Sequence, residues 1–274
     1  MLVKGHSGFG IELVDELTIR KSAKGGNAGR LKRQIAKQIF FQKHFQSDRV
    51  RTPKILRTAG VTQQFHADME FIAAKDFIQF LSEANRQALG GFLEVITDFI
   101  RRNLKRSDDA DVSGQIEQKL VDLEKKNVPA IYIRAARDRC RVPVRVPVGP
   151  CHGDLTLSNI LFKGDHLYLV DFLDCYVESP LQDIVKLRQD TCFGWSLQLY
   201  QADFNWARIQ IALRYLDDNI EAAFRSYDWY GRHYDLFQLV SLMRVLPYCQ
   251  ETKTARLVTD SLDQMLNRSD AKSV

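Results

Sequence analysis

The chain has 274 residues, 45% of them hydrophobic and 27% charged, and it carries a formal net charge of +5. This composition is typical of a soluble globular protein with room for one large or two small domains. No run of about 18 apolar residues occurs, so we expect no membrane-spanning helix. The N-terminus lacks the apolar segment of a secretory signal, and we therefore expect a cytoplasmic location.

Cysteines and charges limit the kinds of site that the chain can hold. The odd number and irregular spacing of the cysteines argue against a disulfide framework or a zinc site and favour a reducing compartment. Residues 20–57 contain twelve Lys or Arg and a single acid, Asp48. Such a block could attract phosphates, anionic substrates, nucleic acid or a membrane surface, but a solvated helix face is the commoner case. No RRM, KH or zinc-finger signature is visible, so we expect no nucleic-acid partner. The five cysteines are Cys140, Cys151, Cys175, Cys192 and Cys249.

The first 75 residues alternate short strands with one helix. Residues 2–21 have imperfectly alternating apolar positions and are interrupted by the glycine-containing stretch GHSGFG, which predicts strands on either side of a turn. Apolar residues at helical spacing, from Leu31 to Phe40, predict a helix over 30–45. Residues 52–60 and 64–74 again have the pattern of short strands. The order is therefore strand, strand, helix, strand, strand.

From about residue 75 helical periodicity dominates. Residues 141–150 cannot be helical because they contain three prolines. Residues 160–172 have two apolar runs around the turn KGDH, which predicts a hairpin. The fold class is therefore α+β, with a small β-rich N-lobe over 1–72 and a larger, mainly helical C-lobe over 73–274. The predicted helices of the C-lobe are 92–104, 113–126, 181–190, 203–227, 236–248 and 254–266.

Three polar residues from two separate stretches share the spacing of a phosphoryl-transfer site. Residues 152–159 read H-G-D-L-x-x-x-N, and the catalytic loop of protein kinases is H-R-D-L-x-x-x-N. Asp171 follows Asn159 by twelve residues, across the predicted hairpin, at the position of the kinase D-F-G aspartate. Each stretch alone could be an ordinary polar turn, but the ordered combination favours a kinase-like site. Asp154 would then be the general base, and Asn159 and Asp171 would supply the hard oxygen ligands that Mg²⁺ prefers.

These residues resemble those of the aminoglycoside phosphotransferase and choline kinase-like family, in which HGD replaces HRD. The match is specific over residues 150–190 and looser over the first 75. The resemblance implies a bilobal protein-kinase-like fold that binds ATP and Mg²⁺ and phosphorylates small molecules. It also implies that His152 supports the loop backbone and that Asp183 is a buried acid bracing the catalytic loop. Without the resemblance, Asp183 could equally be an acid favoured at a helix N-terminus.

The N-lobe offers candidate nucleotide-binding residues. Lys21 in TIRK resembles the strand lysine that holds the α- and β-phosphates, and its neighbour Arg20 should point to the opposite face. Glu70 and Ile72 lie in a stretch that resembles the hinge meeting adenine, although it could be only an apolar strand. A glycine-containing loop could bring its backbone close to phosphates or be a plain hairpin turn. Its residues are Gly5, His6, Ser7 and Gly8.

The sequence departs from the kinase pattern at two places. No acid occurs between Glu16 and Asp48, so Lys21 lacks the helix glutamate with which kinases pair this lysine. Gln34 or Gln38 could hydrogen-bond Lys21 instead. Leu173 also replaces the glycine of D-F-G.

We expect a small-molecule kinase that phosphorylates a hydroxyl of a sugar or a sugar-linked metabolite, with a nucleotide-binding pseudokinase as the alternative. The C-lobe should build the acceptor pocket, and it lacks the dense acidic cluster that would suit a polycationic aminoglycoside. Asp174 could be a metal ligand, a substrate contact or a solvated loop residue. Aromatic residues at helical spacing are more often core than sugar contacts. The candidates for substrate contacts are Asp174, Trp195, Tyr176, Asp190, Tyr200 and Trp206.

Overall fold

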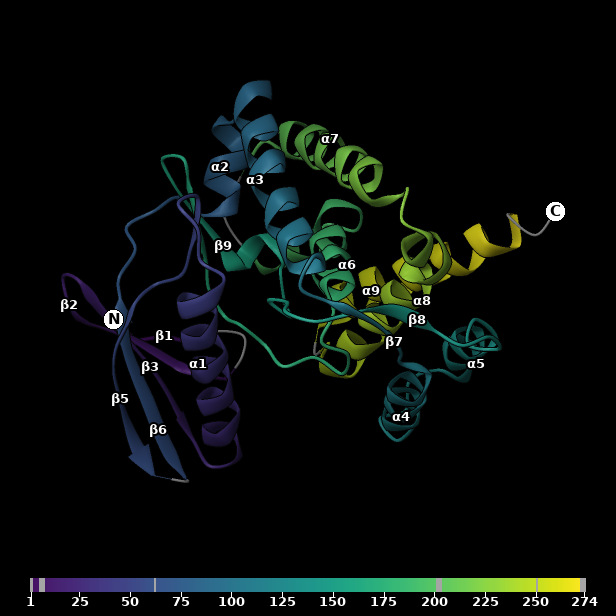
Figure 1. Cartoon of the computed structure of the whole chain (residues 1–274), viewed down its shortest axis with the longest axis horizontal. Helices are drawn as coiled ribbons and strands as arrows, with labels where there is room; N and C mark the ends of the chain where they lie inside the picture. Colours follow the sequence, from purple (N-terminus) through teal and green to yellow (C-terminus); the bar gives the residue numbers. More distant parts are fainter. Residues whose placement is uncertain (1, 5–7, 62, 201–203, 250, 272–274) are drawn as a thin grey trace. The chain divides into compact units, whose positions relative to one another are not determined.

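Two units are distinguishable in the computed structural model, and each is built from two segments of chain (Figure 1). We call residues 1–91 with 157–174 the sheet unit, and residues 92–156 with 175–274 the helical unit. Both units are discontinuous in sequence, whereas the predicted lobes over 1–72 and 73–274 are continuous, and those lobe boundaries stay a prediction. The structure describes residues 2–4, 8–61, 63–200, 204–249 and 251–271.

A five-stranded antiparallel sheet forms most of the sheet unit, in the order β1-β2-β3-β6-β5. Helix α1 (Gly26–His44) lies along one face of this sheet (Figure 1). Leu31 and Ile35 of α1 are buried with Ala67 and Met69 of β6, because these apolar positions recur at helical spacing on α1 and alternate along the strand. The predicted helix between two groups of strands is confirmed, but residues 2–24 form three strands where two were predicted, and the two-residue strand β4 (Val50–Arg51) precedes β5 and β6. The strands are β1 (Leu2–Lys4), β2 (Gly10–Asp15), β3 (Thr18–Lys24), β5 (Ile55–Val61) and β6 (Gln64–Glu70).

The second segment of the sheet unit contains the predicted hairpin. Strands β9 (Ile160–Lys163) and β10 (His166–Leu169) pair antiparallel, and β10 also pairs in parallel with β4 (Val50–Arg51). Gly164 makes the tight turn at a φ of 56°, in the left-handed region that favours glycine. Helix α2 (Phe77–Glu83) begins at an Asp76–Gln79 capping box.

The helical unit is built around two helices that are buried on most sides. All twelve residues of α6 (Pro180–Thr191) are buried, as are ten of α8 (Asp228–Val245). A helix that is enclosed in this way lies in a core. The unit also contains the antiparallel strand pair β7 (Asp108–Asp111) and β8 (Arg145–Val148), which is separated in the chain by α4 (Ser113–Glu124) and α5 (Ala130–Asp138). Its other helices are α7 (Trp206–Phe224) and α9 (Thr252–Ala271), and α3 (Arg86–Leu104) starts in the sheet unit and continues into the helical unit.

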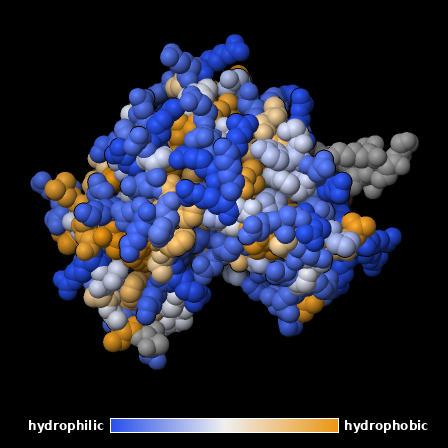
Figure 2. Space-filling model, in the orientation of Figure 1, coloured by the Kyte–Doolittle hydropathy of each residue, from blue (hydrophilic) through white to orange (hydrophobic). Residues whose placement is uncertain are grey.

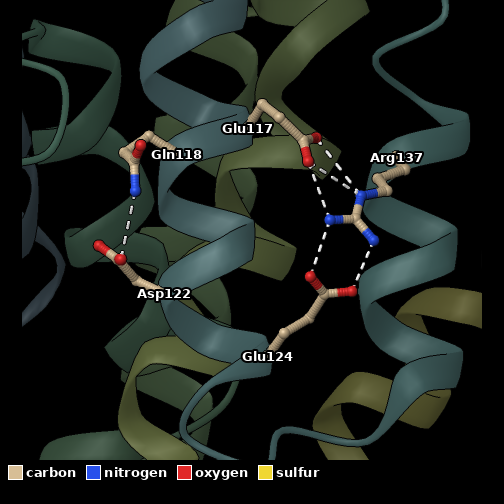
Figure 3. A network of polar contacts seen from close by, with 5 residues as sticks. All are labelled: Glu117, Gln118, Asp122, Glu124 and Arg137. Atoms are coloured by element: carbon tan, nitrogen blue, oxygen red, sulfur yellow. Dashed lines mark hydrogen bonds and ion pairs between the residues drawn. The ribbon is translucent and has the colours of Figure 1, made fainter.

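An arginine joins α4 to α5 on the surface of the helical unit (Figure 3). The Arg137 guanidinium contacts Glu117 at 2.8 Å and Glu124 at 2.6 Å. The hydrogen bonds to Glu124 and Glu117 raise the pKa of Arg137, and the one from Arg137 lowers the pKa of Glu124. Because all three side chains are well exposed, solvent screens the pair, and it contributes little stability.

Figure 2 shows mostly hydrophilic residues on the visible face of the molecule, with hydrophobic residues in small groups. Among the described residues, no helix combines the length and the hydropathy needed to cross a membrane.

Candidate active site

The loop at His152–Asp154 is clamped by one buried carboxylate. Asp183 accepts hydrogen bonds from the backbone N–H groups of His152 and Gly153, both at 2.7 Å. Asp183 has no exposed surface. It lies in the first turn of α6, which begins after an N-cap at Ser179 with Pro180 in the first helical position. The backbone N–H of Asp154 donates to His152 Nδ1 at 3.2 Å, so the imidazole also supports the loop.

Asp154 forms an ion pair with Lys186, whose ammonium lies 3.2 Å from the carboxylate. Burial tends to raise the pKa of Asp154, but the positive charges of Lys186, His152 and Arg244 more than offset that effect, and the pKa lies below its ordinary value. The Asp154 carboxyl is therefore ionised at neutral pH, as a proton acceptor must be.

Lys186 is a site residue that the sequence analysis missed. It lies three residues after Asp183 on α6, and residues at this spacing share a helix face. If Asp183 faces the loop, Lys186 must face it as well, so the helical spacing from Asp183 was the available signal. Its side chain is only 9% exposed, which is unusual for a lysine and reflects its pairing with Asp154.

Lys21 meets two partners inside the sheet unit. Its ammonium donates to Asp171 Oδ1 at 2.7 Å and to Gln34 Oε1 at 3.2 Å. Of the two glutamines that could have held Lys21, it is Gln34 that does, while Gln38 donates to the carbonyl of Pro53. Arg20, next to Lys21 on β3, pairs instead with Asp68 at 2.7 Å.

The hairpin brings Asp171 back to Asn159. The N–H of Val170 donates to the carbonyl of Asn159 at 3.0 Å, directly before Asp171. Asp171 has a φ of 62°, a left-handed conformation that few non-glycine residues adopt and that is common at functional sites. A carboxylate and an amide oxygen from neighbouring backbone positions are a chemically suitable donor set for Mg²⁺.

Helix α1 holds the residues that follow Asp171. Phe172 packs against the ring of Phe41 at 4.9 Å, and Lys37 donates to the carbonyl of Leu173 at 2.8 Å. Leu173, which replaces the glycine of D-F-G, is therefore held through its backbone. Arg33 pairs with Asp174 at 2.8 Å, at an exposed position. Part of the basic block thus binds this segment, a use that differs from both interpretations of the block made from the sequence.

The glycine-containing loop joins β1 to β2. Gly8 has a φ of 76°, and Phe9 is fully buried beneath the Lys21 ammonium, which lies 4.7 Å from the ring centroid. The predicted residues Gly5, His6 and Ser7 lie outside the described residues, so their expected contact with phosphates stays a prediction.

The predicted hinge ends β6. The N–H of Glu70 donates to the carbonyl of Lys54, and the N–H of Phe71 donates to the carbonyl of Leu17. Both N–H groups are thus engaged within the sheet unit, and the contact of Glu70 and Ile72 with adenine stays a prediction. The Glu70 side chain lines a polar cavity with Thr52 and Tyr168.

The acceptor candidates have different surroundings. Trp195 is half-buried at the start of a short 3₁₀ helix (Trp195–Leu199). Asp190 accepts from the N–H and hydroxyl of Ser196 at 2.7 and 2.9 Å, so it is a local structural acid. The Tyr176 ring lies 5.2 Å from the Arg244 guanidinium, and burial raises the pKa of its hydroxyl.

Comparisons with known proteins agree with this arrangement. A family model described as the phosphotransferase enzyme family matches residues 17–217, which is most of the chain. No curated protein matches.

Among solved structures, the GDP complex of a mutant aminoglycoside 2'-phosphotransferase-IIIa has a TM-score of 0.68 at 12% identity, over 97% of this chain and 90% of that one. An aminoglycoside phosphotransferase APH(4)-Ia with AMP-PNP and hygromycin B has a TM-score of 0.59 at 12% identity, over 94% and 93% of the two chains. An aminoglycoside phosphotransferase APH(3'')-Id from Streptomyces rimosus has a TM-score of 0.55 at 14% identity, over 89% and 92%.

These structural matches confirm the protein-kinase-like fold, with a small sheet-rich N-terminal part and a larger helical C-terminal part. The family match confirms the resemblance carried by the HGD loop. The chain belongs to the phosphotransferase enzyme family and is a small-molecule kinase, an enzyme that transfers phosphate to a hydroxyl group.

Proposed function

We propose that the protein is an ATP- and Mg²⁺-dependent kinase that phosphorylates a hydroxyl of a sugar or a sugar-linked metabolite. The observation that carries this proposal is the state of Asp154, which Lys186 holds ionised on a loop clamped by Asp183. A loop held by buried hydrogen bonds to a charged acceptor is well suited to position a hydroxyl.

The helical unit supplies the base. Asp154 orients the acceptor hydroxyl and takes its proton late in the reaction. Meanwhile the hydroxyl oxygen bonds to the γ-phosphorus, and the bond from that phosphorus to the bridging oxygen of ADP breaks. Lys186 keeps Asp154 ionised. His152 and Asp183 hold the loop rather than take part in the proton transfer.

The sheet unit supplies the nucleotide side. Lys21 would bind the α- and β-phosphates, with Gly8 in the loop above them and Ile72 beside adenine. Asn159 and Asp171 would hold Mg²⁺, which when bound neutralises charge on the phosphates. Lys21 and Asp171 pair with each other at 2.7 Å. When the nucleotide and Mg²⁺ bind, this ion pair would break, because Lys21 would contact the phosphates and Asp171 would contact the metal.

The identity of the nucleotide needs a direct comparison. Structural relatives are described with GDP, with ADP and with AMP-PNP. ATP is our proposal, and GTP is the competitor to include in every assay.

A neutral acceptor suits the helical unit better than a polycation. Asp217 pairs with Arg188 at 2.8 Å, and Glu221 contacts the same guanidinium. With Asp190 bound to Ser196, these acids already serve internal contacts. Trp195 remains the candidate contact to a sugar in the helical unit, since an aromatic face can pack on a sugar ring. Asp174 of the sheet unit, which pairs with Arg33 at an exposed position, stays a candidate because a carboxylate can accept from sugar hydroxyls.

The test combines purified protein, Mg²⁺ and ATP or GTP with a panel of sugars, sugar-linked metabolites, amino alcohols and aminoglycosides. Phosphorylated product should appear with a neutral sugar-type acceptor, and Asp154→Asn should bind nucleotide but form almost no product. Nucleotide binding without transfer to any acceptor would support a pseudokinase, and transfer to aminoglycosides alone would overturn the proposed acceptor.

A further inference from the structure

Two cysteines and a glutamate meet next to the catalytic loop, within the helical unit. The ligand atoms of Cys151, Cys175 and Glu178 all lie within 4.8 Å of one another. The Cys151 thiol donates to Glu178 Oε2 at 3.2 Å, and Glu178 Oε1 accepts from the N–H of Cys175 at 2.8 Å. Cys151 is buried, whereas Cys175 and Glu178 are half-buried, so the cluster is reachable from solvent on one side.

No pattern in the sequence indicates this cluster. Cys151 and Cys175 are separated by 23 residues that include the β9–β10 hairpin, and neither belongs to a CxxC pair. Glu178 follows Cys175 by three residues and folds back over it through the hydrogen bond to its backbone. The expectation that the chain holds no zinc site rested on spacing alone, which says nothing about cysteines that the fold brings together.

We propose that Cys151, Cys175 and Glu178 form a binding site for a thiophilic divalent cation of the zinc class. Zn²⁺ takes thiolate sulfur at about 2.3 Å and carboxylate oxygen at about 2.0–2.2 Å in a tetrahedral arrangement. That geometry places two sulfurs roughly 3.8 Å apart, so the observed separations require shifts of an ångström or less. Water would complete the four ligands. Binding releases the two thiol protons and leaves Glu178 as the third ligand.

Occupancy of this site would act on the catalytic loop. The Cys175 thiol donates to the carbonyl of Gly153 at 3.3 Å, and Cys151 directly precedes His152. A cation that binds the Cys175 sulfur displaces the thiol proton, so Gly153 loses its hydrogen bond, while the Cys151 side chain becomes fixed as a ligand. Asp154 directly follows Gly153, so we expect the bound cation to lower turnover; this effect on turnover, unlike binding itself, rests on the proposed function.

Binding is tested first, on the full chain with a non-thiol reductant present. Co²⁺ is the probe, because thiolate coordination gives an intense charge-transfer absorption that oxygen ligands do not. Wild type should show this band, and Zn²⁺ should displace it. Cys175→Ser and Glu178→Gln should each weaken Co²⁺ binding by more than the roughly 10–100-fold that loss of an outer-shell partner costs.

Cys140→Ser and Cys249→Ser are the matched controls. Burial raises the pKa of both thiols, to about 11 for Cys140, and neither belongs to the cluster. Both variants should keep the wild-type spectrum. Zn²⁺ should also raise the melting temperature of wild type and of the controls, but not of Cys175→Ser, which guards against a variant that merely fails to fold. Absence of the thiolate band in wild type, or its persistence in Cys175→Ser, would overturn the site.

The activity arm separates this site from the nucleotide metals. At saturating Mg²⁺, Zn²⁺ should lower kcat in wild type and in Cys140→Ser and leave the residual kcat of Cys175→Ser unchanged. Equal inhibition of all three proteins would mean that Zn²⁺ acts elsewhere, such as at Asn159 and Asp171, and would overturn the regulatory effect. If no acceptor is ever phosphorylated, the proposed function fails, but the Co²⁺ spectrum still decides the metal site.

Discussion

Each unit contains a lysine–aspartate ion pair. The two lysine side chains are similarly buried, whereas the two aspartates differ in exposure and in backbone conformation. Lys21 contacts Asp171 at 2.7 Å and Lys186 contacts Asp154 at 3.2 Å, and both lysine side chains are less than 10% exposed. Asp171 is 42% exposed and has a left-handed φ, whereas Asp154 is 29% exposed and follows a loop that Asp183 clamps.

The difference suits two different tasks. A base must keep its position and stay ionised until it takes the proton; the hydrogen bonds to Asp183 hold the loop before Asp154, and Lys186 favours its ionised form. In the proposed function Asp171 would exchange Lys21 for a metal ion, and its side chain, part of which is exposed to solvent, leaves room for that exchange.

The largest expected effect is on the base. Asp154→Asn should lower kcat by roughly 10²–10⁴-fold, since general base catalysis contributes about that much. The affinity for nucleotide, measured by calorimetry, should stay close to wild type. A variant with near wild-type kcat would remove Asp154 from the mechanism.

Replacing Asp183 should lower the free energy of unfolding more than replacing Asp171, the proposed metal ligand. Asp183→Asn places an amide against two backbone donors and should lower the free energy of unfolding by about 1–3 kcal/mol. The half-exposed Asp171, changed to Asn, is the matched comparison and should cost less. Urea denaturation of both variants measures this, and equal losses would mean that the two aspartates are held alike.

Lys186 should set the acid limit of activity. Lys186→Met removes a positive charge that lowers the pKa of Asp154, so the pKa rises and the base is lost at a higher pH. The acidic limb of kcat/KM should therefore move to higher pH, and along that limb the rate should fall about tenfold when the pH drops by one. Lys186→Arg keeps the positive charge, so the acidic limb of its kcat/KM profile should stay at the wild-type pH. If the acidic limb of Lys186→Met also stays at the wild-type pH, the ion pair does not lower the pKa of Asp154.

The smallest expected effect comes from restoring the missing helix acid. Gln34→Glu should hold Lys21 by a charge-assisted bond, which is about twice as strong as a neutral one, and so release Asp171 for metal. We expect KM for Mg²⁺–ATP to fall a few-fold with little change in kcat. Ala36→Glu adds the same charge on the exposed face of α1 and should do nothing; a similar change in both variants would indicate a general electrostatic effect.

The helices and strands could be predicted where the apolar residues repeat with one period over a long enough stretch of sequence. The presence of strands on both sides of α1, α1 itself, the β9–β10 hairpin and α6 follow from apolar spacing, prolines and glycines, whereas the number of strands before α1 was predicted wrongly. Short elements were missed, such as α2 (Phe77–Glu83) and the two-residue strand β4, because neither is long enough to show a period.

Part of the candidate site follows from spacing in the sequence. The predicted hairpin returns Asp171 to Asn159 within the sheet unit, while the roles of Asp154, Asn159 and Asp171 stay a prediction. Lys186 was not recognised because a helix lysine is usually solvated, and only the position of Asp183 shows which way it faces. The partnership of Lys21 with Asp171 crosses 150 residues, and no local pattern reports it.

The most direct test of the division of tasks is Mg²⁺-dependent nucleotide binding, measured by calorimetry with and without Mg²⁺. We predict that Mg²⁺ tightens ATP binding in wild type and in Asp154→Asn but not in Asp171→Asn. Unchanged Mg²⁺ dependence in Asp171→Asn, or its loss in Asp154→Asn, would contradict the account.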